Sequence, residues 1–329
     1  MLLIKWFGEK IRKNVSQNNI RTCAKHTICC FGFALFIESK GKAMQKNLIG
    51  KRVAVFGANG GLGTEICKKV IENGGDLVAV VRSEEKAKQL GEKIKKAYPQ
   101  ATTTFLFCDL SDISSVDSLC NQLIDLDVDV LVHNAGAYAI PRHRCSSGFD
   151  NVFTINFISP YYITRRLIPT LEKNKGRVVA VGSIAHNYNR CDFTDVDFSA
   201  RKKPSHAYGN AKRYLMYALG ELSKHYPDVS FAVTHPGITF TNITAHYPPL
   251  IFAIIKHPMK VIFPPPKKAV GSIIEGLFTS TEPNSWIGPS LFNVWGKPRK
   301  QPLKTATQKE IDGIYNTAEE IYLKIKNNP

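Results

Sequence analysis

A tyrosine and a lysine lie four residues apart in the stretch SHAYGNAKRY, which spans residues 205–214. In a helix, residues at i and i+4 share a face, so the Tyr208 phenol and the Lys212 ammonium can act on one target. A phenol has a pKa of about 10, and a nearby cation favours the phenolate and lowers that pKa. The pair predicts proton transfer by Tyr208, although an ordinary surface helix is the alternative. Gly209 and Ala211 are expected to keep the space beside the pair clear.

A glycine-rich turn lies far upstream, in FGANGGLG at residues 56–63. Its glycines follow the spacing Gly57-x-x-x-Gly61-x-Gly63, between an apolar strand-like run and a helical pattern. Glycine permits a tight turn and a close approach of the backbone to a pyrophosphate, which the amides of the next helix then bind. The turn therefore predicts dinucleotide binding, and a purely structural turn is the alternative.

Strand-like and helix-like segments alternate around these motifs. Near-continuous apolar strands that alternate with amphipathic helices are typical of a parallel sheet covered on both faces. The fold class is therefore α/β, with a Rossmann-type doubly wound parallel sheet in a single domain over residues 44–329. The predicted strands are 52–57, 76–82, 102–110, 128–136, 176–183 and 230–237, and the predicted helices are 62–75, 83–98, 111–126, 148–173 and 207–226.

Together these motifs resemble the short-chain dehydrogenase/reductase family, over residues 51–241 and more loosely to about residue 295. The specificity comes from several motifs that occur in the family's order. After the glycine turn these are Asp109, His133-Asn134-Ala135-Gly136, Asn156, Ser183, the pair Tyr208 and Lys212, and Pro236-Gly237 with Thr241.

The resemblance implies hydride transfer between an alcohol and its carbonyl compound. Tyr208 would be the general acid in reduction and the general base in oxidation, and Ser183 would donate a hydrogen bond to the carbonyl oxygen. Lys212 would also bind the ribose hydroxyls, and Asn156 would order a helix carbonyl and a water. The predicted catalytic residues are Tyr208, Lys212, Ser183 and Asn156. The predicted cofactor-binding residues are Gly57, Asn59, Gly60, Gly61, Leu62, Gly63, Arg82, Asp109, Leu110, Asn134, Ala135, Gly136, Tyr208, Lys212, Pro236, Gly237 and Thr241.

Three residues depart from the family pattern. Phe56 stands where the family usually has Thr, His133 replaces the first Asn, and Gly182 replaces the first Ser of a common pair. None of these changes removes a catalytic group, so they affect local rigidity more than activity. The long segment between Ser183 and Tyr208 resembles the retinol-dehydrogenase-like branch.

The cofactor preference follows from the end of the second strand. The pattern that binds NAD has a carboxylate at this position, whereas this chain has Val81 followed by Arg82. A guanidinium suits a 2′-phosphate, and Lys86 is placed to assist it. NADP is therefore predicted, and Glu84 and Glu85 keep NAD as the alternative.

The substrate is predicted from residues 242–268, which are apolar, rich in proline and interspersed with lysines. In the family this region covers the substrate, so an apolar alcohol, ketone or aldehyde of steroid, retinoid or lipid type is expected. Tyr138, His143 and Tyr188 are further candidates for the pocket lining. The alternative is a core helix, or a helix at a lipid interface whose lysines extend to the headgroups.

The formal net charge of +17 on 329 residues allows nucleic acid, an anionic membrane surface or a phosphate-bearing ligand. No nucleic-acid module is recognisable, so no nucleic-acid partner is predicted. The eight cysteines form no C-x-x-C pair, so no metal site is expected. This pattern of cysteines is typical of a protein in a reducing compartment. A cytoplasmic location, with peripheral membrane contact and a homodimer as open alternatives, is the resulting prediction.

The first 43 residues are basic and contain the apolar run ICCFGFALFI at 28–37. Spanning a bilayer takes about 20 apolar residues, so this run is too short. Residues 1–43 are predicted to be a basic extension that is either poorly ordered or membrane-associated.

Two other activities compete with the reductase. An NADP-binding regulatory protein without catalysis would share the glycine turn, but it would not need Ser183, Tyr208 and Lys212 together. A sugar-nucleotide epimerase would share the Tyr–Lys pair, but the glycine spacing fits it less well.

Overall fold

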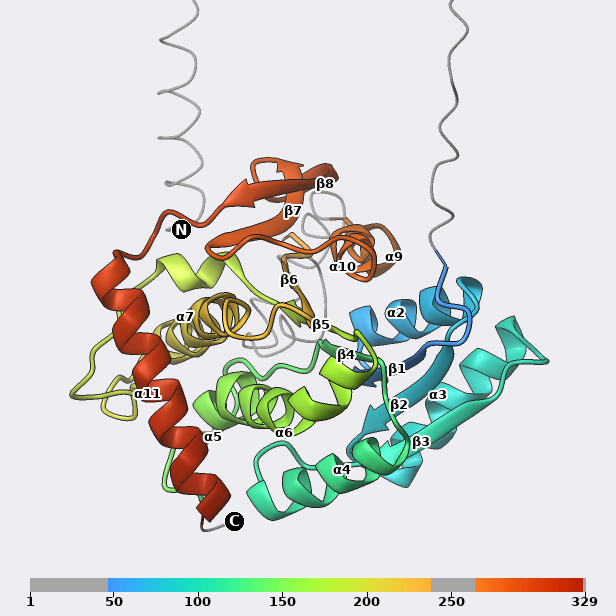
Figure 1. Cartoon of the computed structure of the whole chain (residues 1–329), viewed down its shortest axis with the longest axis horizontal. Coiled ribbons are helices and arrows are strands. Elements are labelled where there is room, and N and C mark those ends of the chain that lie inside the picture. The colour runs from blue at the N-terminus through green and yellow to red at the C-terminus, as the bar shows by residue number, and fades with distance from the viewer. Residues whose placement is uncertain (1–46, 238–263, 328–329) are drawn as a thin grey trace, which may run out of the picture. The chain divides into compact units, whose positions relative to one another are not determined.

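Eight strands form one sheet in the computed structural model, which describes residues 47–237 and 264–327 (Figure 1). The spatial order is β3-β2-β1-β4-β5-β6-β7-β8; the first seven strands are parallel and β8 is antiparallel to β7. The strands are β1 Arg52–Phe56, β2 Asp76–Val81, β3 Thr103–Phe107, β4 Val130–His133, β5 Arg177–Val181, β6 Ser230–Thr234, β7 Ser285–Leu291 and β8 Trp295–Pro302. The doubly wound sheet in one domain is therefore confirmed.

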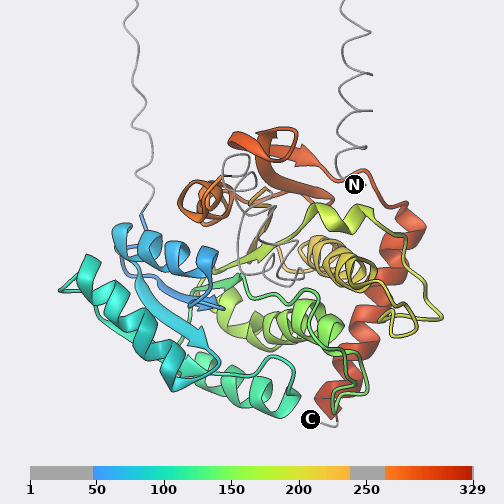
Figure 2. The same ribbon diagram turned by 180° about the vertical axis from the view of Figure 1, so that it is seen from behind.

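Alternating side chains of each strand bury opposite faces of the sheet. In β1, Ala54 and Phe56 pack into one core, and Val53 and Val55 pack into the other. Helices cover both faces, as the two opposite views show (Figures 1 and 2). The first core holds α4 Ile113–Asp125, α6 Ser159–Lys173, α7 Pro204–Leu222 and α11 Gln308–Asn327, and the second holds α2 Gly61–Glu72, α3 Glu84–Ala97 and α10 Gly271–Gly276. The short helix α9 Pro266–Ala269 precedes α10.

Local sequence signals explain the helix boundaries. The Ser83 hydroxyl accepts a hydrogen bond from the Lys86 amide and so caps α3, as an N-cap serine is expected to do. Helix α2 instead begins after Gly60, with no side-chain cap and no acidic residue in its first turn. That helix N-terminus keeps its amides available for an anion.

The long helical segment predicted over 148–173 contains one irregularity. It begins as α5 Asn151–Phe153, widens into the π-turn η1 Thr154–Ile158, and continues as α6. Asn156 lies inside the π-turn. Such wide turns occur often at functional sites, because they reorient the side chains that they carry.

The C-terminal region contributes elements that were not predicted from the sequence, namely β7, β8 and α11. Helix α11 packs Ile311, Ile314, Ala318 and other apolar side chains into the core beside α6 and α7. Residues 1–43, for which a basic extension is predicted, lie outside the described residues, as does most of the segment 242–268. Within the described ranges, no helix is long and apolar enough to cross a membrane.

Candidate active site

Ser183 and Tyr208 meet where the carboxyl end of β5 faces the first turns of α7. Ser183 follows β5 and caps the short helix η2 Ile184–Asn187, where its hydroxyl accepts from the Ala185 amide at 3.2 Å. A hydrogen bond joins the Ser183 side chain to the Tyr208 phenol. The structure therefore brings together two residues that lie 25 positions apart and that the sequence predicts to act on one oxygen.

Lys212 lies one turn after Tyr208 and is almost fully buried, with 2% of its surface exposed. Its Nζ donates to the Val181 carbonyl at 2.9 Å and lies 5.9 Å from the centroid of the Tyr208 ring. Burial lowers the pKa of Lys212 to about 8. Lys212 is thus held against the end of β5, on the same helix face as Tyr208.

The predicted effect of Lys212 on Tyr208 differs from the structure. The sequence predicts a lowered phenol pKa, whereas burial raises the pKa of Tyr208 to about 12, and the hydrogen bond with Ser183 offsets only part of the rise. The physical reason is that burial disfavours the phenolate, while the Lys212 ammonium is directed at the Val181 carbonyl. The prediction of a lowered pKa for Tyr208 was therefore wrong for the protein by itself.

Asn156 is fully buried in the π-turn and connects two backbone segments. Its Nδ2 donates to the carbonyls of Ala137 and Val152, each at 2.8 Å, and its Oδ1 accepts from the Ala137 amide at 3.3 Å. A Cβ placed on Gly136 would come within 2.9 Å of Asn156 Oδ1 and 3.6 Å of Lys212 Nζ. Asn156 and Lys212 therefore both lie close to Gly136.

Gly209 and Ala211 are small for a reason that the sequence did not indicate. A Cβ on Gly209 would lie 2.4 Å from the Ala185 carbonyl oxygen, so α7 and η2 are in contact there. Ala211 is fully buried in the core. The prediction that these residues clear space beside the Tyr208–Lys212 pair is therefore wrong, because both lie against protein.

The glycine turn has the geometry that a pyrophosphate needs. Gly57 has a φ of +68°, and a Cβ on Gly63 would lie 2.1 Å from the Gly57 carbonyl oxygen. Asn134 holds the turn from β4, because its Nδ2 donates to the Phe56 and Gly57 carbonyls at 3.2 and 3.1 Å. Asn59 and Gly60 complete the turn, Gly61 and Leu62 are the first two residues of α2, and Ala135 lies against Gly57. The uncapped N-terminus of α2 and this turn fit a dinucleotide.

Two departures from the family pattern lie in contact. Phe56 and His133 are paired in register on β1 and β4, and their rings stack with centroids 4.8 Å apart. His133 Nε2 lies 2.9 Å from the Thr164 hydroxyl, which itself donates to the Pro160 carbonyl. That hydroxyl must therefore accept from His133, which places the imidazole proton on Nε2. Burial lowers the pKa of His133 to about 3, so the ring is neutral.

Arg82 and Asp109 lie near each other at the ends of β2 and β3. Burial raises the pKa of Asp109, but hydrogen bonds from Ser111 and the nearby Arg82 charge outweigh it, so the pKa lies below its usual value. Arg82 is exposed. The carbonyl of Leu110 accepts from the Ser159 hydroxyl at 2.6 Å, which connects this edge to α6.

Of the remaining predicted residues, some lie near the site and others do not. Gly237 has a φ of +84° and lies against Val294 of the β7–β8 turn, and Pro236 is buried beside it. Thr241 lies outside the described residues. Tyr138 meets Tyr208 edge to face at 5.3 Å, whereas Tyr188 is exposed.

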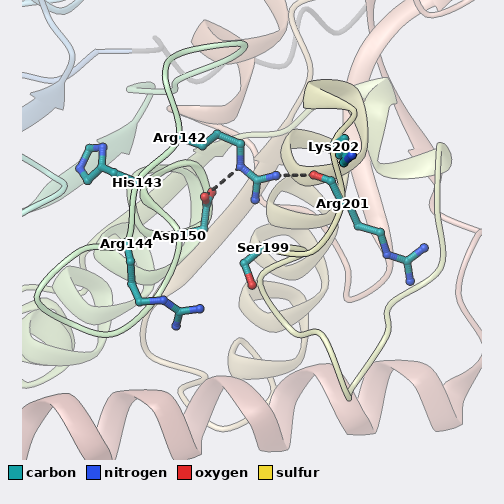
Figure 3. A pocket seen from close by; sticks show the side chains of 7 residues that line it. All are labelled: Arg142, His143, Arg144, Asp150, Ser199, Arg201 and Lys202. Atoms are coloured by element: carbon teal, nitrogen blue, oxygen red, sulfur yellow. Dashed lines mark hydrogen bonds and ion pairs between the residues drawn. The ribbon is translucent and has the colours of Figure 1, made fainter.

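A hollow of about 390 Å³ lies between the loop after β4 and the loop before α7 (Figure 3). Its lining residues are Arg142, His143, Arg144, Asp150, Ser199, Arg201 and Lys202. Arg142 crosses between the loops, because its Nε pairs with Asp150 at 2.9 Å and its terminal nitrogens donate to the carbonyls of Phe198 and Arg201. Arg201 pairs with Asp192 at 2.7 Å. His143 is one of the lining residues, and Arg142 ties the two loops together.

Sequence reasoning missed Arg213, which directly follows Lys212 and is 1% exposed. A charged residue among apolar neighbours on a predicted buried helix was the available signal. In the described ranges, no group of three or more His, Cys, Asp or Glu side chains is placed to hold a metal ion.

The family model described as short chain dehydrogenase matches residues 51–248. Curated relatives include a polyprenol dehydrogenase from Homo sapiens, 28% identical over 59% of this chain and 63% of that protein. Another is the retinol dehydrogenase 13 of Homo sapiens, 27% identical over 60% of this chain and 61% of that protein. The chain thus spans less than two thirds of the length of these relatives.

Solved structures agree on the fold. A protein from Mycobacterium paratuberculosis has a TM-score of 0.65 at 22% identity, covering 84% of this chain and 95% of that one. A 3-oxoacyl (acyl-carrier-protein) reductase from Agrobacterium tumefaciens with NADP bound has a TM-score of 0.58 at 19% identity, covering 75% of this chain and 96% of that one.

Proposed function

This chain belongs to the short-chain dehydrogenase family, and we propose that it is an NADP-dependent oxidoreductase that interconverts an apolar alcohol and its ketone or aldehyde. The observation that carries the proposal is the meeting of Ser183, Tyr208 and Lys212 at the carboxyl end of β5. The family and its retinol-dehydrogenase-like branch are confirmed by the matching model and the named relatives.

The proposed cofactor is NADP, with NAD as the alternative. The glycine turn and the uncapped N-terminus of α2 would hold the pyrophosphate, and Arg82 would meet a 2′-phosphate. Bound there, the cofactor would supply or accept the hydride. The NADP in the related reductase structure supports this preference by analogy.

Tyr208 is proposed to hold and move the proton. In reduction, the phenol proton passes to the substrate oxygen as negative charge develops there, and the Ser183 hydroxyl donates a hydrogen bond to the same oxygen. A phenol with a pKa of about 12 remains protonated at neutral pH, so it is ready as an acid. In oxidation Tyr208 would first have to lose its proton.

Lys212 and Asn156 are proposed to support that proton transfer. Lys212 would bind the ribose hydroxyls, because its Nζ has donors beyond the one used on Val181. Asn156 fixes the Ala137 segment beside Gly136, so the backbone next to Lys212 keeps its shape. Both roles follow from groups that lie within a few ångströms of Gly136.

The apolar substrate is proposed from the surroundings of Tyr208. Tyr208 and Ile140 pack against Val152, Phe198 and Ala207, so apolar side chains border the phenol on the protein side. The names of two relatives point to polyprenol and retinol as the substrates of those proteins. Both substrates are long apolar alcohols. The role of residues 242–268 as a cover, the homodimer, the peripheral membrane contact and the cytoplasmic location stay predictions.

The test is NADPH oxidation across a panel of apolar ketones and aldehydes, with the Tyr208→Phe variant beside the native chain. Loss of the acid should lower kcat by about 10²- to 10⁴-fold, while NADPH binding is kept. Tyr98→Phe is the matched control, because Tyr98 ends α3 and its phenol contacts Glu72. Undiminished turnover in Tyr208→Phe would refute the assignment, and NADPH binding without any native turnover would favour the regulatory protein instead.

A further inference from the structure

Helix α7 carries a second pair at i and i+4, one position after the first. Gly209 and Arg213 share a face, and this face meets η2 and α11. Arg213 is fully buried and makes a bidentate pair with Glu310 of α11, with Nε–Oε1 and Nη2–Oε2 distances of 2.8 Å each. The face next to Tyr208 and Lys212 is therefore tied to the C-terminal helix.

The Arg213–Glu310 pair also holds the backbone of three other segments. Arg213 Nη2 donates to the Thr305 carbonyl at 2.6 Å, in the connection between β8 and α11. Arg213 Nη1 donates to the His186 carbonyl at 3.0 Å, in η2. Glu310 Oε1 accepts from the Cys191 amide at 2.9 Å, in the loop after η2. One buried pair thus joins the C-terminal region to the segment that begins with Ser183.

The path continues from His186 to the proposed chemistry. His186 Nδ1 lies 2.6 Å from the Ser183 carbonyl, and the Ser183 side chain is hydrogen-bonded to Tyr208. Gly209 fixes the other side of η2, because the Ala185 carbonyl lies where a Cβ would be. One face of α7 thus contacts two neighbouring carbonyls of η2, those of Ala185 and His186, just after Ser183.

Stability alone does not explain a buried ion pair. Removing two charges from water is costly, and well-packed apolar residues of similar volume are often equally stabilising. What apolar residues cannot do is bind the three backbone groups of Thr305, His186 and Cys191 at fixed distances. The bidentate geometry of Arg213 therefore points to a requirement for position.

We propose that Arg213, held by Glu310, is a positioning residue that fixes η2 so that the Ser183 hydroxyl meets Tyr208 in the productive geometry. The proposal rests on the oxidoreductase function proposed above. It makes α11 part of the support of the active site, although α11 lies more than 90 positions beyond Tyr208 in the sequence. Substrate and cofactor do not need to touch Arg213.

The test compares two ion pairs that α11 makes in the full chain. Arg213→Met removes the proposed positioning contact, and Arg165→Met removes the pair between α6 and Glu319 of the same helix, with an Nε–Oε1 distance of 2.9 Å. The double variant Arg213→Met with Glu310→Leu replaces the buried pair by apolar side chains. Each variant is assayed for kcat, KM for NADPH, and the urea midpoint of unfolding.

The expected result separates catalysis from stability. Arg213→Met should lower kcat by about 10²-fold, the effect of a displacement of about 1 Å, with KM for NADPH almost unchanged. The double variant should recover the urea midpoint and keep the low kcat, whereas Arg165→Met should lose stability and keep kcat. Equal kcat in Arg213→Met and Arg165→Met, or a kcat that recovers together with the midpoint in the double variant, overturns the proposal.

A second measurement keeps this inference separate from the proposed function. Absence of hydride transfer by the native chain would overturn the proposed function. Amide hydrogen exchange across residues 183–191 tests the positioning link without turnover. Exchange should be faster in Arg213→Met than in Arg165→Met at matched stability, and equal exchange rates overturn the link.

Discussion

Two adjacent faces of α7 carry residue pairs at the same spacing and use them differently. Tyr208 and Lys212 present a phenol and an ammonium at the end of β5. The pair Gly209 and Arg213 is rotated by about 100°, because a helix has about 3.6 residues per turn. Gly209 leaves room for the Ala185 carbonyl of η2, and Arg213 donates to carbonyls of η2 and of the β8–α11 connection. The comparison shows that one short helical stretch carries both the proposed acid/base pair and, one position later, the pair that contacts η2.

Replacing Lys212 by Met is expected to give the largest contrast between the two faces. The kcat should fall by about 10²-fold or more, because the charge behind the proton transfer is lost. The urea midpoint should hold or rise, because burial lowers the pKa of Lys212 to about 8 and an apolar side chain removes the cost of burying the charge. Lys203→Met, at the exposed start of α7, is the control for kcat. A lowered midpoint with unchanged kcat would assign Lys212 to the structural face.

Gly209→Ala probes the other face through shape alone. The new Cβ would lie 2.4 Å from the Ala185 carbonyl oxygen, and overpacking of this kind costs about 1–3 kcal/mol. We expect a lower melting temperature together with a lower kcat, because η2 must move. In Gly220→Ala on the same helix the nearest atom would be 3.5 Å away, so that control should be neutral or slightly stabilising. Equal melting temperatures for the two variants would contradict the contact.

Acidification should lower the stability of the region around Trp286 gradually, over several pH units. Burial lowers the pKa of His186 to about 4 and that of His235 to about 3, and both rings pack on Trp286. An unfolded chain binds these protons at about pH 6.5, so stability falls as the pH drops from 6.5 toward 4, by about 1 kcal/mol per pH unit for each histidine.

Urea unfolding at pH 7.5, 6 and 5 checks this dependence. His186→Gln should flatten the pH dependence of the unfolding free energy by about one proton relative to the native chain. An unchanged slope in His186→Gln would show that this ring is not buried in its neutral form.

The sequence predicted the first six strands of the sheet well, because each strand from β1 to β6 is a short apolar run between turn residues. It predicted the meeting of Ser183 with Tyr208 through a family motif. It did not predict β8, whose residues WGKPRKQP are polar and contain prolines, because an exposed edge strand lacks the apolar signal.

The errors at the site share one physical cause. The lowered pKa of Tyr208 and the open space beside Gly209 were both argued from neighbours along the helix. In the structure, burial of the phenol and the carbonyl of Ala185 decide the outcome. The Arg213–Glu310 contact joins residues 97 positions apart, and neither residue alone indicates the other.

The stacked rings of Phe56 and His133 bear on how this chain diverged from its relatives. Each ring fills the space beside the other across β1 and β4, and His133 also donates a hydrogen bond to the Thr164 hydroxyl. Restoring the usual family residue at one position would leave a void or an unmatched polar group next to the glycine turn. The two departures thus form one packing unit, and we expect a transfer of this turn to another member of the family to need both residues.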